Sequence, residues 1–143
     1  MSVRAALLCS LLLALSACGP SLSPEHAKYL KTAKDHPTQF IMLKSEEREA
    51  WGRAVLWIRS YSSMNLVTVN DSLIATDPPG KGRDWELSYG YTVEKKSKGD
   101  RVEISVLCGA NNTFNAGDAQ ENAHLLAYYI ATGEPNPPQL IHK

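Results

Sequence analysis

The sequence predicts an α+β fold: a bent four-stranded antiparallel sheet packed against two main helices, with a short N-terminal helix before them. Three observations lead to this prediction. Apolar residues recur at helical spacing in two segments, four other segments are β-branched or alternate apolar with polar residues, and turn-forming residues separate them. The length of 143 residues favours one domain whose core needs neither disulfides nor metal.

The N-terminal helix is expected over residues 24 to about 34. Ser23 is a good N-cap, Pro24 suits the first helical position, and Pro37 ends the helix. The apolar residues of this segment are sparse, which predicts a helix at the surface. Residues 39–43 are expected to be a brief extended stretch that leads to the next helix.

The first main helix is expected over residues 45–61, with Ser45 as its N-cap. Projection at helical spacing places most of its apolar residues on one broad face, with Trp57 at the edge. Trp51, on that face, is therefore expected to supply buried area. The residues of the face are Ala50, Trp51, Ala54, Val55, Ile58 and Tyr61.

Four strands are expected to form two hairpins. Residues 66–69 and 73–76 are short β-branched runs that form a tight hairpin around residues 70–72. Residues 85–94 and 101–108 alternate apolar with polar side chains, which is typical of antiparallel strands with one wet face.

Two details of the second hairpin can be predicted. Pairing Glu94 with Arg101 sets opposite charges across the strands, whereas a slip by two residues would set Glu94 against Glu103. We therefore expect the first register. Gly90, in the middle of its strand, indicates a bend or a bulge.

The second main helix is expected from near residue 115 to residue 132, and Gly133 ends it. Leu125, Tyr128 and Tyr129 project away from its main apolar stripe, which indicates either a second buried face or an exposed contact surface. The whole arrangement resembles a cystatin-type or related helix-on-curved-sheet domain, a resemblance that implies no function. The residues of the main stripe are Ala119, Ala123, Leu126 and Ile130.

The start of the chain has the pattern of an export signal. Arg4 supplies a basic first segment, and residues 5–17 are apolar apart from two serines and carry no charge. At about 1.5 Å per residue such a helix spans about 20 Å, which is short of the roughly 30 Å hydrocarbon core of a bilayer. The segment is therefore predicted to be a cleaved signal peptide rather than a membrane-spanning anchor.

The signal ends in Leu15-Ser16-Ala17-Cys18, which resembles the lipobox of bacterial lipoproteins. The resemblance covers residues 1–18 alone. It implies that acyl chains are attached to the sulfur of Cys18 and that the chain is cut before this residue. The alternative is an ordinary secretory signal, cleaved near Ala17, that would leave Cys18 as a free thiol.

The lipobox resemblance also implies a place in the cell. Two or three long acyl chains, palmitate among them, would hold the protein permanently on a membrane of the cell envelope. Gly19 follows the cysteine, where lipoproteins retained at the inner membrane often carry aspartate, so an outer-membrane anchor with a periplasm-facing domain is expected. The chain then divides into a signal peptide (1–17), a lipidated tether (18–23) and one globular domain (24–143).

The three cysteines would then have different fates. Cys9 would leave with the signal and Cys18 would carry lipid, so Cys108 would stand alone without an internal disulfide. Cys108 is in phase with the apolar residues of its strand, and we expect it to be buried. An intermolecular disulfide is the alternative.

Composition and motifs argue against several function classes. Loss of the signal leaves 15 − 1 = 14 basic and 15 acidic residues, and so nearly neutral a surface gives no reason to expect a nucleic-acid partner. The four histidines are scattered without matched neighbours, so no metal is expected. Because no nucleophile motif or phosphate-binding loop occurs, we expect neither catalysis nor a cofactor.

The leading hypothesis is therefore a non-enzymatic envelope lipoprotein, attached to the membrane by its lipid, that presents an interaction domain to an envelope protein. Tyr128 and Tyr129 belong to the expected contact surface. The alternative is a lipoprotein that binds a small ligand or a lipid in a pocket between helix and curved sheet. The residues expected to line that pocket are Trp51, Trp85, Tyr89 and Tyr91.

A third hypothesis is a hydrolase whose residues meet only after folding. A cleft that brings Asp84 or Glu86 next to a histidine would favour it.

Overall fold

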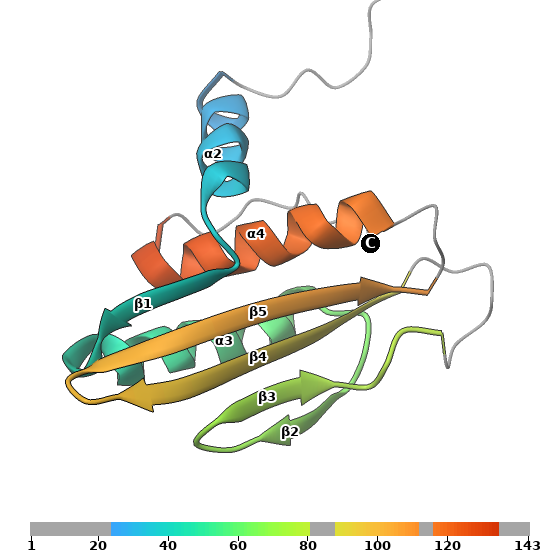
Figure 1. The fold of residues 1–143 in the computed structure, drawn as a ribbon. Coiled ribbons are helices and arrows are strands. Elements are labelled where there is room, and N and C mark those ends of the chain that lie inside the picture. The colour runs from blue at the N-terminus through green and yellow to red at the C-terminus, as the bar shows by residue number, and fades with distance from the viewer. Residues whose placement is uncertain (1–23, 81–87, 112–115, 135–143) are drawn as a thin grey trace, which may run out of the picture.

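The computed structural model describes residues 24–80, 88–111 and 116–134. Within these ranges five antiparallel strands form one open sheet in the order β1-β5-β4-β3-β2, with α3 and α4 packed beside it (Figure 1). The predicted α+β class is confirmed. In chain order the elements are α2 (Pro24–Asp35), β1 (Gln39–Leu43), the 3-10 helix η1 (Lys44–Glu46), α3 (Glu47–Tyr61), β2 (Leu66–Val69), β3 (Leu73–Thr76), β4 (Tyr89–Lys98), β5 (Arg101–Ala110) and α4 (Ala116–Thr132).

The predicted number of strands is wrong by one. Residues 39–43, expected to be a connection, form β1, which pairs with β5 along its whole length. Gln39 lies opposite Ser105, and Leu43 lies opposite Arg101. The sequence signal was weak because all residues of β1 except Gln39 are apolar, and a short apolar run does not distinguish a strand from a connector. β1 forms one edge of the sheet and β2 forms the other.

The N-terminal helix ends one residue beyond the expected position and is better packed than expected. α2 has 12 residues, about the average for a globular protein. Ala33 is fully buried, and Lys34 forms an ion pair of 2.9 Å with Glu121 of α4. α2 stands on α4, with its N-terminal end pointing away from the sheet (Figure 1).

The hairpin of β4 and β5 has a register that differs from the prediction. Glu94 lies opposite Ser105 rather than Arg101. Arg101 is instead opposite Lys98, because a two-residue turn containing Gly99, with φ of +66°, joins the strands. A turn of this kind fixes the register, whereas an exposed ion pair contributes only about 0–1 kcal/mol.

Gly90 does not form the predicted bulge. The pairing of β4 with β5 continues without a shift from Tyr89 to Lys98. A shift occurs instead in β2, between Leu66 and Thr68. Gly90 is buried beneath the segment that leaves β3, so its role is to permit a close approach of two backbones.

The core lies between one face of the sheet and the helices. Val102, Ile104 and Val106 of β5 point into it and are almost completely buried. On α3, Trp57 is only 1% exposed, whereas Trp51 is half-buried. The prediction that Trp51 lies on the buried face and Trp57 at its edge is wrong for these two residues, because α3 packs against α4 as well as the sheet.

α4 is buried on more than one side. Its predicted stripe is confirmed, and Leu125 and Tyr129 are also buried, so the residues beside the stripe form a second buried face. Tyr128 is half-buried and packs edge-to-face on Tyr29 of α2, with ring centroids 5.6 Å apart. The buried stripe consists of Ala119, Ala123, Leu126 and Ile130.

Arg53 joins the two main helices by capping the C-terminal end of α4. Its Nε and Nη2 atoms both donate to the carbonyl oxygen of Ile130, at 2.9 and 2.6 Å. Gly133 ends α4 with φ of +71°, and a Cβ atom there would lie 3.1 Å from Arg53 Nη1. The positive guanidinium therefore lies where the helix dipole is negative and where carbonyls lack helical partners.

Arg53→Ala is expected to lower the free energy of unfolding by about 2 kcal/mol, because it leaves a partly buried carbonyl without its charged donor. Arg53→Lys should recover only part of this loss, since an ammonium cannot reproduce the two-pronged contact. Urea denaturation measures both effects. Arg48→Ala, at an exposed arginine of the same helix, should change stability by less than about 0.5 kcal/mol; equal losses at Arg48 and Arg53 would contradict the capping role.

Candidate functional site

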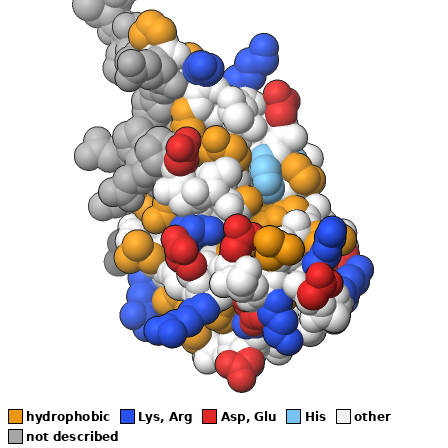
Figure 2. Space-filling model, turned by 90° about the vertical axis from the view of Figure 1, so that its left-hand side faces the viewer, with side chains coloured by type: hydrophobic (Ala, Val, Ile, Leu, Met, Phe, Trp, Pro, Cys, Tyr) orange, Lys and Arg blue, Asp and Glu red, His pale blue; other side chains and the backbone are white. Residues whose placement is uncertain are grey.

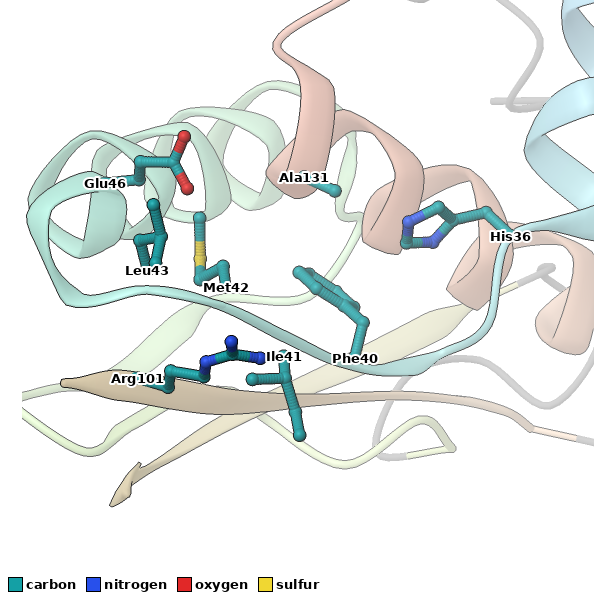
Figure 3. A pocket seen from close by; sticks show the side chains of 8 residues that line it. All are labelled: His36, Phe40, Ile41, Met42, Leu43, Glu46, Arg101 and Ala131. Carbon is teal, nitrogen blue, oxygen red and sulfur yellow. The ribbon is translucent and has the colours of Figure 1, made fainter. Parts of the chain in front are cut away.

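A groove of about 390 Å³ opens beside β1, between the C-terminal end of α4 and η1 (Figure 3). Phe40 and Met42 point from β1 toward the helical layer, His36 lies at one end of the groove, and Glu46 lies at the other. The residues that line it are His36, Phe40, Ile41, Met42, Leu43, Glu46, Arg101 and Ala131.

The groove exists because the described helices leave part of β1 uncovered. α4 ends at Thr132, and the chain after β1 turns directly into η1 at Lys44. Phe40 and Met42 therefore lie only half-buried at the border of the core. This side of the molecule, at the left of Figure 1, is seen face on in Figure 2, where hydrophobic side chains gather around a histidine.

His36 makes one wall of the groove aromatic. Its ring packs edge-to-face on Phe40, with centroids 5.1 Å apart, and on Tyr128, at 5.8 Å. The backbone oxygen of His36 lies 2.6 Å from His124 Nδ1, which must donate because a carbonyl can only accept. Burial lowers the pKa of His36 below its ordinary value of 6.5, so the ring is neutral at pH 7.

Two of the large apolar side chains that line the groove are also in contact with solvent. Ile41 is 52% exposed and Leu43 is 51% exposed. Ile41 points away from the helical layer, on the opposite side of β1 from Phe40 and Met42 (Figure 3). Apolar groups are thus available on both faces of one short edge strand, as at surfaces that bind other proteins.

The backbone of β1 is also available for pairing. Thr38 O accepts from Val106 N, and Lys44 N donates to Asp100 O, both bonds being directed toward β5. Because successive residues of a strand point their N–H and C=O groups to alternate sides, the even-numbered residues of β1 face β5. Residues 39, 41 and 43 therefore face away from it, and no described backbone group pairs with them there.

Three of the aromatic residues predicted to form a ligand or partner surface are buried. Tyr89, Tyr91 and Tyr129 are at most 8% exposed and belong to the core. The hydroxyl of Tyr89 donates to Asp118 Oδ2 at 3.4 Å, and burial with the nearby carboxylate raises the pKa of Tyr89 to about 12. The described part of the expected pocket is thus filled by core side chains.

Trp51 is bound by its neighbours rather than open to a ligand. Its Nε1 donates to Asn70 O at 3.0 Å, and Lys95 Nζ lies 4.5 Å from the ring centroid. Lys95 also pairs with Glu47. Of the predicted surface residues only Tyr128 lies near the groove, through its contact with His36.

Four of the predicted positions lie outside the described residues, namely Cys18, Asp84, Trp85 and Glu86. Cys108 is partly buried, and burial raises the pKa of its thiol to about 12, so the thiolate that reacts is scarce at neutral pH.

Two features are absent from the described residues. No group of three histidine, cysteine or carboxylate side chains is positioned to hold a metal ion. No helix there combines the length and the apolar character needed to cross a bilayer.

Sequence reasoning missed the groove because its residues come from elements far apart in the chain, with Ala131 of α4 facing residues 36–46. A usable signal was present: residues 39–43 are a mostly apolar run with neither charge nor proline, as expected of a strand that another strand can join. Comparison of the chain with known protein families, curated proteins and solved structures found no match. The resemblance to cystatin-type domains therefore stays a prediction.

Proposed function

We propose that this protein is a cell-envelope lipoprotein, held at a membrane by acyl chains on Cys18, and that its domain is a non-catalytic protein-interaction module. The proposal places the anchor in the outer membrane and the domain in the periplasm. The anchor is supported by the basic start, the apolar segment and the Leu15-to-Cys18 sequence that follows it.

The observation that carries the interaction function is the outer edge of β1, which no other described strand covers. An edge strand is a template for pairing with another strand, and proteins usually protect such edges with charge, proline or a bulge. β2, the other edge, is only four residues long and contains a register shift. β1 contains no charge, proline or register shift from Gln39 to Leu43, and Ile41 and Leu43 are about half exposed.

Cys18→Ser is expected to move the protein from the membrane fraction to the soluble fraction and to abolish its labelling by radioactive palmitate. Each methylene of an attached chain contributes about 0.8 kcal/mol of membrane affinity, so loss of two or three chains removes the anchor. We expect at least about a tenfold fall in the membrane-bound fraction. The outer-membrane location is tested by separating the inner and outer membranes of cells that produce the unaltered protein on a density gradient and measuring which of them contains it.

The matched control is Cys108→Ser, which removes a cysteine from β5 and should leave both palmitate labelling and membrane association unchanged. Loss of labelling in both variants would point to misfolding. A Cys18→Ser protein that remained on the membrane, or an unaltered protein without palmitate, would refute the proposed anchor.

The alternative function is binding of a small apolar ligand. It is favoured by the groove volume of about 390 Å³, which falls within the usual range of about 300–1,000 Å³ for ligand pockets. Native mass spectrometry of the detergent-extracted protein distinguishes the two functions, since a small molecule retained by the protein and lost on Phe40→Glu substitution would favour this alternative.

A further inference from the structure

We propose that β1 pairs antiparallel with β1 of a second copy of this chain, across a two-fold axis at Ile41, so that two sheets become one. This inference deepens the proposed interaction function by naming the partner, and its argument about orientation rests on the proposed anchor at Cys18.

The outward backbone groups of β1 in one copy can pair with the same groups in a second copy. The outward groups belong to residues 39, 41 and 43, which are spaced symmetrically about residue 41. In a two-fold pair centred there, Ile41 lies opposite Ile41 of the other copy and Gln39 lies opposite Leu43. Every outward N–H then meets an outward C=O, as a hydrogen-bonded antiparallel pair requires.

The side chains follow the same symmetry. On the helical side, Phe40 of one copy lies opposite Met42 of the other, at the floor of the groove (Figure 3), and thioether–aromatic contacts are favourable. On the open face the two Ile41 side chains, each 52% exposed, cover one another. Apolar surface on both faces is therefore removed from water by a single pairing.

Charge also favours a second copy. No residue from Gln39 to Leu43 is charged, so two copies of the strand do not repel each other. His36 precedes β1 by the same number of residues by which Glu46 follows it, and both line the groove. The two-fold axis thus brings the imidazole of each copy toward the carboxylate of the other, and a neutral imidazole can donate its ring N–H to a carboxylate oxygen.

The direction of the N-terminus fits two copies on one membrane. The axis that relates neighbouring antiparallel strands is perpendicular to the sheet, so the helical layers of both copies lie on the same side. α2 stands on that layer with its N-terminal end away from the sheet (Figure 1). The two Pro24 residues, at the N-terminal ends of the α2 helices, therefore lie on the same side of the pair, as two anchors in the same membrane require.

The test is disulfide formation in cells that produce the full chain with Ile41→Cys in a Cys108→Ala background. Symmetric pairing places the two new cysteines directly opposite, with Cα atoms about 5.5 Å apart, within the range of a disulfide. After oxidation of isolated membranes, a non-reducing gel should show a dimer that mass spectrometry assigns to a bond between the two residues at position 41.

Leu107→Cys in the same background is the matched control. Leu107 lies on the open face and is 64% exposed, but it belongs to β5, so at least three strand spacings, about 14 Å, would separate the two copies. We expect roughly tenfold more linked dimer for Ile41→Cys than for Leu107→Cys. Equal yields, or a link from position 41 to another protein only, would overturn the proposed pairing.

Register is tested by producing two differently tagged copies together, one with Gln39→Cys and the other with Leu43→Cys. The mixed pair should link more efficiently than either variant with itself, and the opposite result would exclude pairing centred on Ile41. Failure of the anchor is detected separately. Linked dimer in the soluble fraction would refute membrane attachment and support the pairing. Membrane-bound protein without linkage would support membrane attachment and refute the pairing.

Discussion

Replacement of Trp57 by alanine is expected to lower the free energy of unfolding by about 3–5 kcal/mol, the usual cost of removing a fully buried tryptophan. The Trp57 side chain is 1% exposed. Its ring centroid lies 5.0 Å from that of Tyr61 and 5.5 Å from that of Tyr129 of α4. Truncation therefore opens a cavity where α3, α4 and the sheet meet, and these rings cannot fill it without moving a helix.

Urea unfolding followed by far-ultraviolet circular dichroism measures this loss, because fluorescence would change with the tryptophan itself. Trp51→Ala is the matched control on the same helix. Trp51 is half-buried, with one hydrogen bond and a lysine over its ring, and its removal should cost about 1–2 kcal/mol. A larger loss at Trp51 than at Trp57 would show that the core is arranged differently.

The two tryptophans also show how far periodicity predicts burial. Helical spacing correctly placed Ala50, Ala54 and Ile58 on the buried side of α3. It reversed the roles of Trp51 and Trp57 because a projection yields one average direction, whereas α3 is covered by two neighbours. The position of α4 beside α3 depends on packing between distant segments, and the spacing of residues within one helix carries no information about it.

Strand prediction succeeded where turns and β-branched residues coincide. The hairpin of residues 66–69 and 73–76 was predicted with the observed bounds, since Asn70 Oδ1 accepts from the backbone of Ser72 and Leu73 and closes the turn locally. β1 is not joined to its partner by such a turn, because β5 lies more than fifty residues later in the chain. A strand defined only by a distant partner leaves little local signal.

For the candidate site, the sequence predicted the kind of side chain that forms a contact surface but not which residues form it. The sequence analysis expected aromatic residues to form a contact surface, but burial competes for such side chains, and Tyr89, Tyr91 and Tyr129 went to the core. The groove was assembled from less conspicuous residues at the sheet edge, where the helices end. Its existence follows from where α4 stops relative to β1, a property of the tertiary structure.

Gly90→Ala is expected to lower the free energy of unfolding by about 3 kcal/mol, at the upper end of the usual cost of overpacking. A Cβ atom at Gly90 would lie 2.7 Å from Pro79 Cδ and 2.9 Å from Asp77 O. The crossing segment is held in place, since Asp77 N donates to Asn65 O at 2.8 Å. The clash therefore cannot be relieved by rotating a flexible side chain, and the backbone itself has to shift.

Gly109 is the matched control because it lies directly opposite Gly90 in the β4–β5 ladder. A Cβ atom there would meet Pro79 Cγ at 3.5 Å, an ordinary contact, so Gly109→Ala should be nearly neutral in urea denaturation. If the glycines served only to let the strands flex, both substitutions would act alike. A large loss confined to Gly90 means that close passage of the chain from β3 over β4 selects glycine at this position.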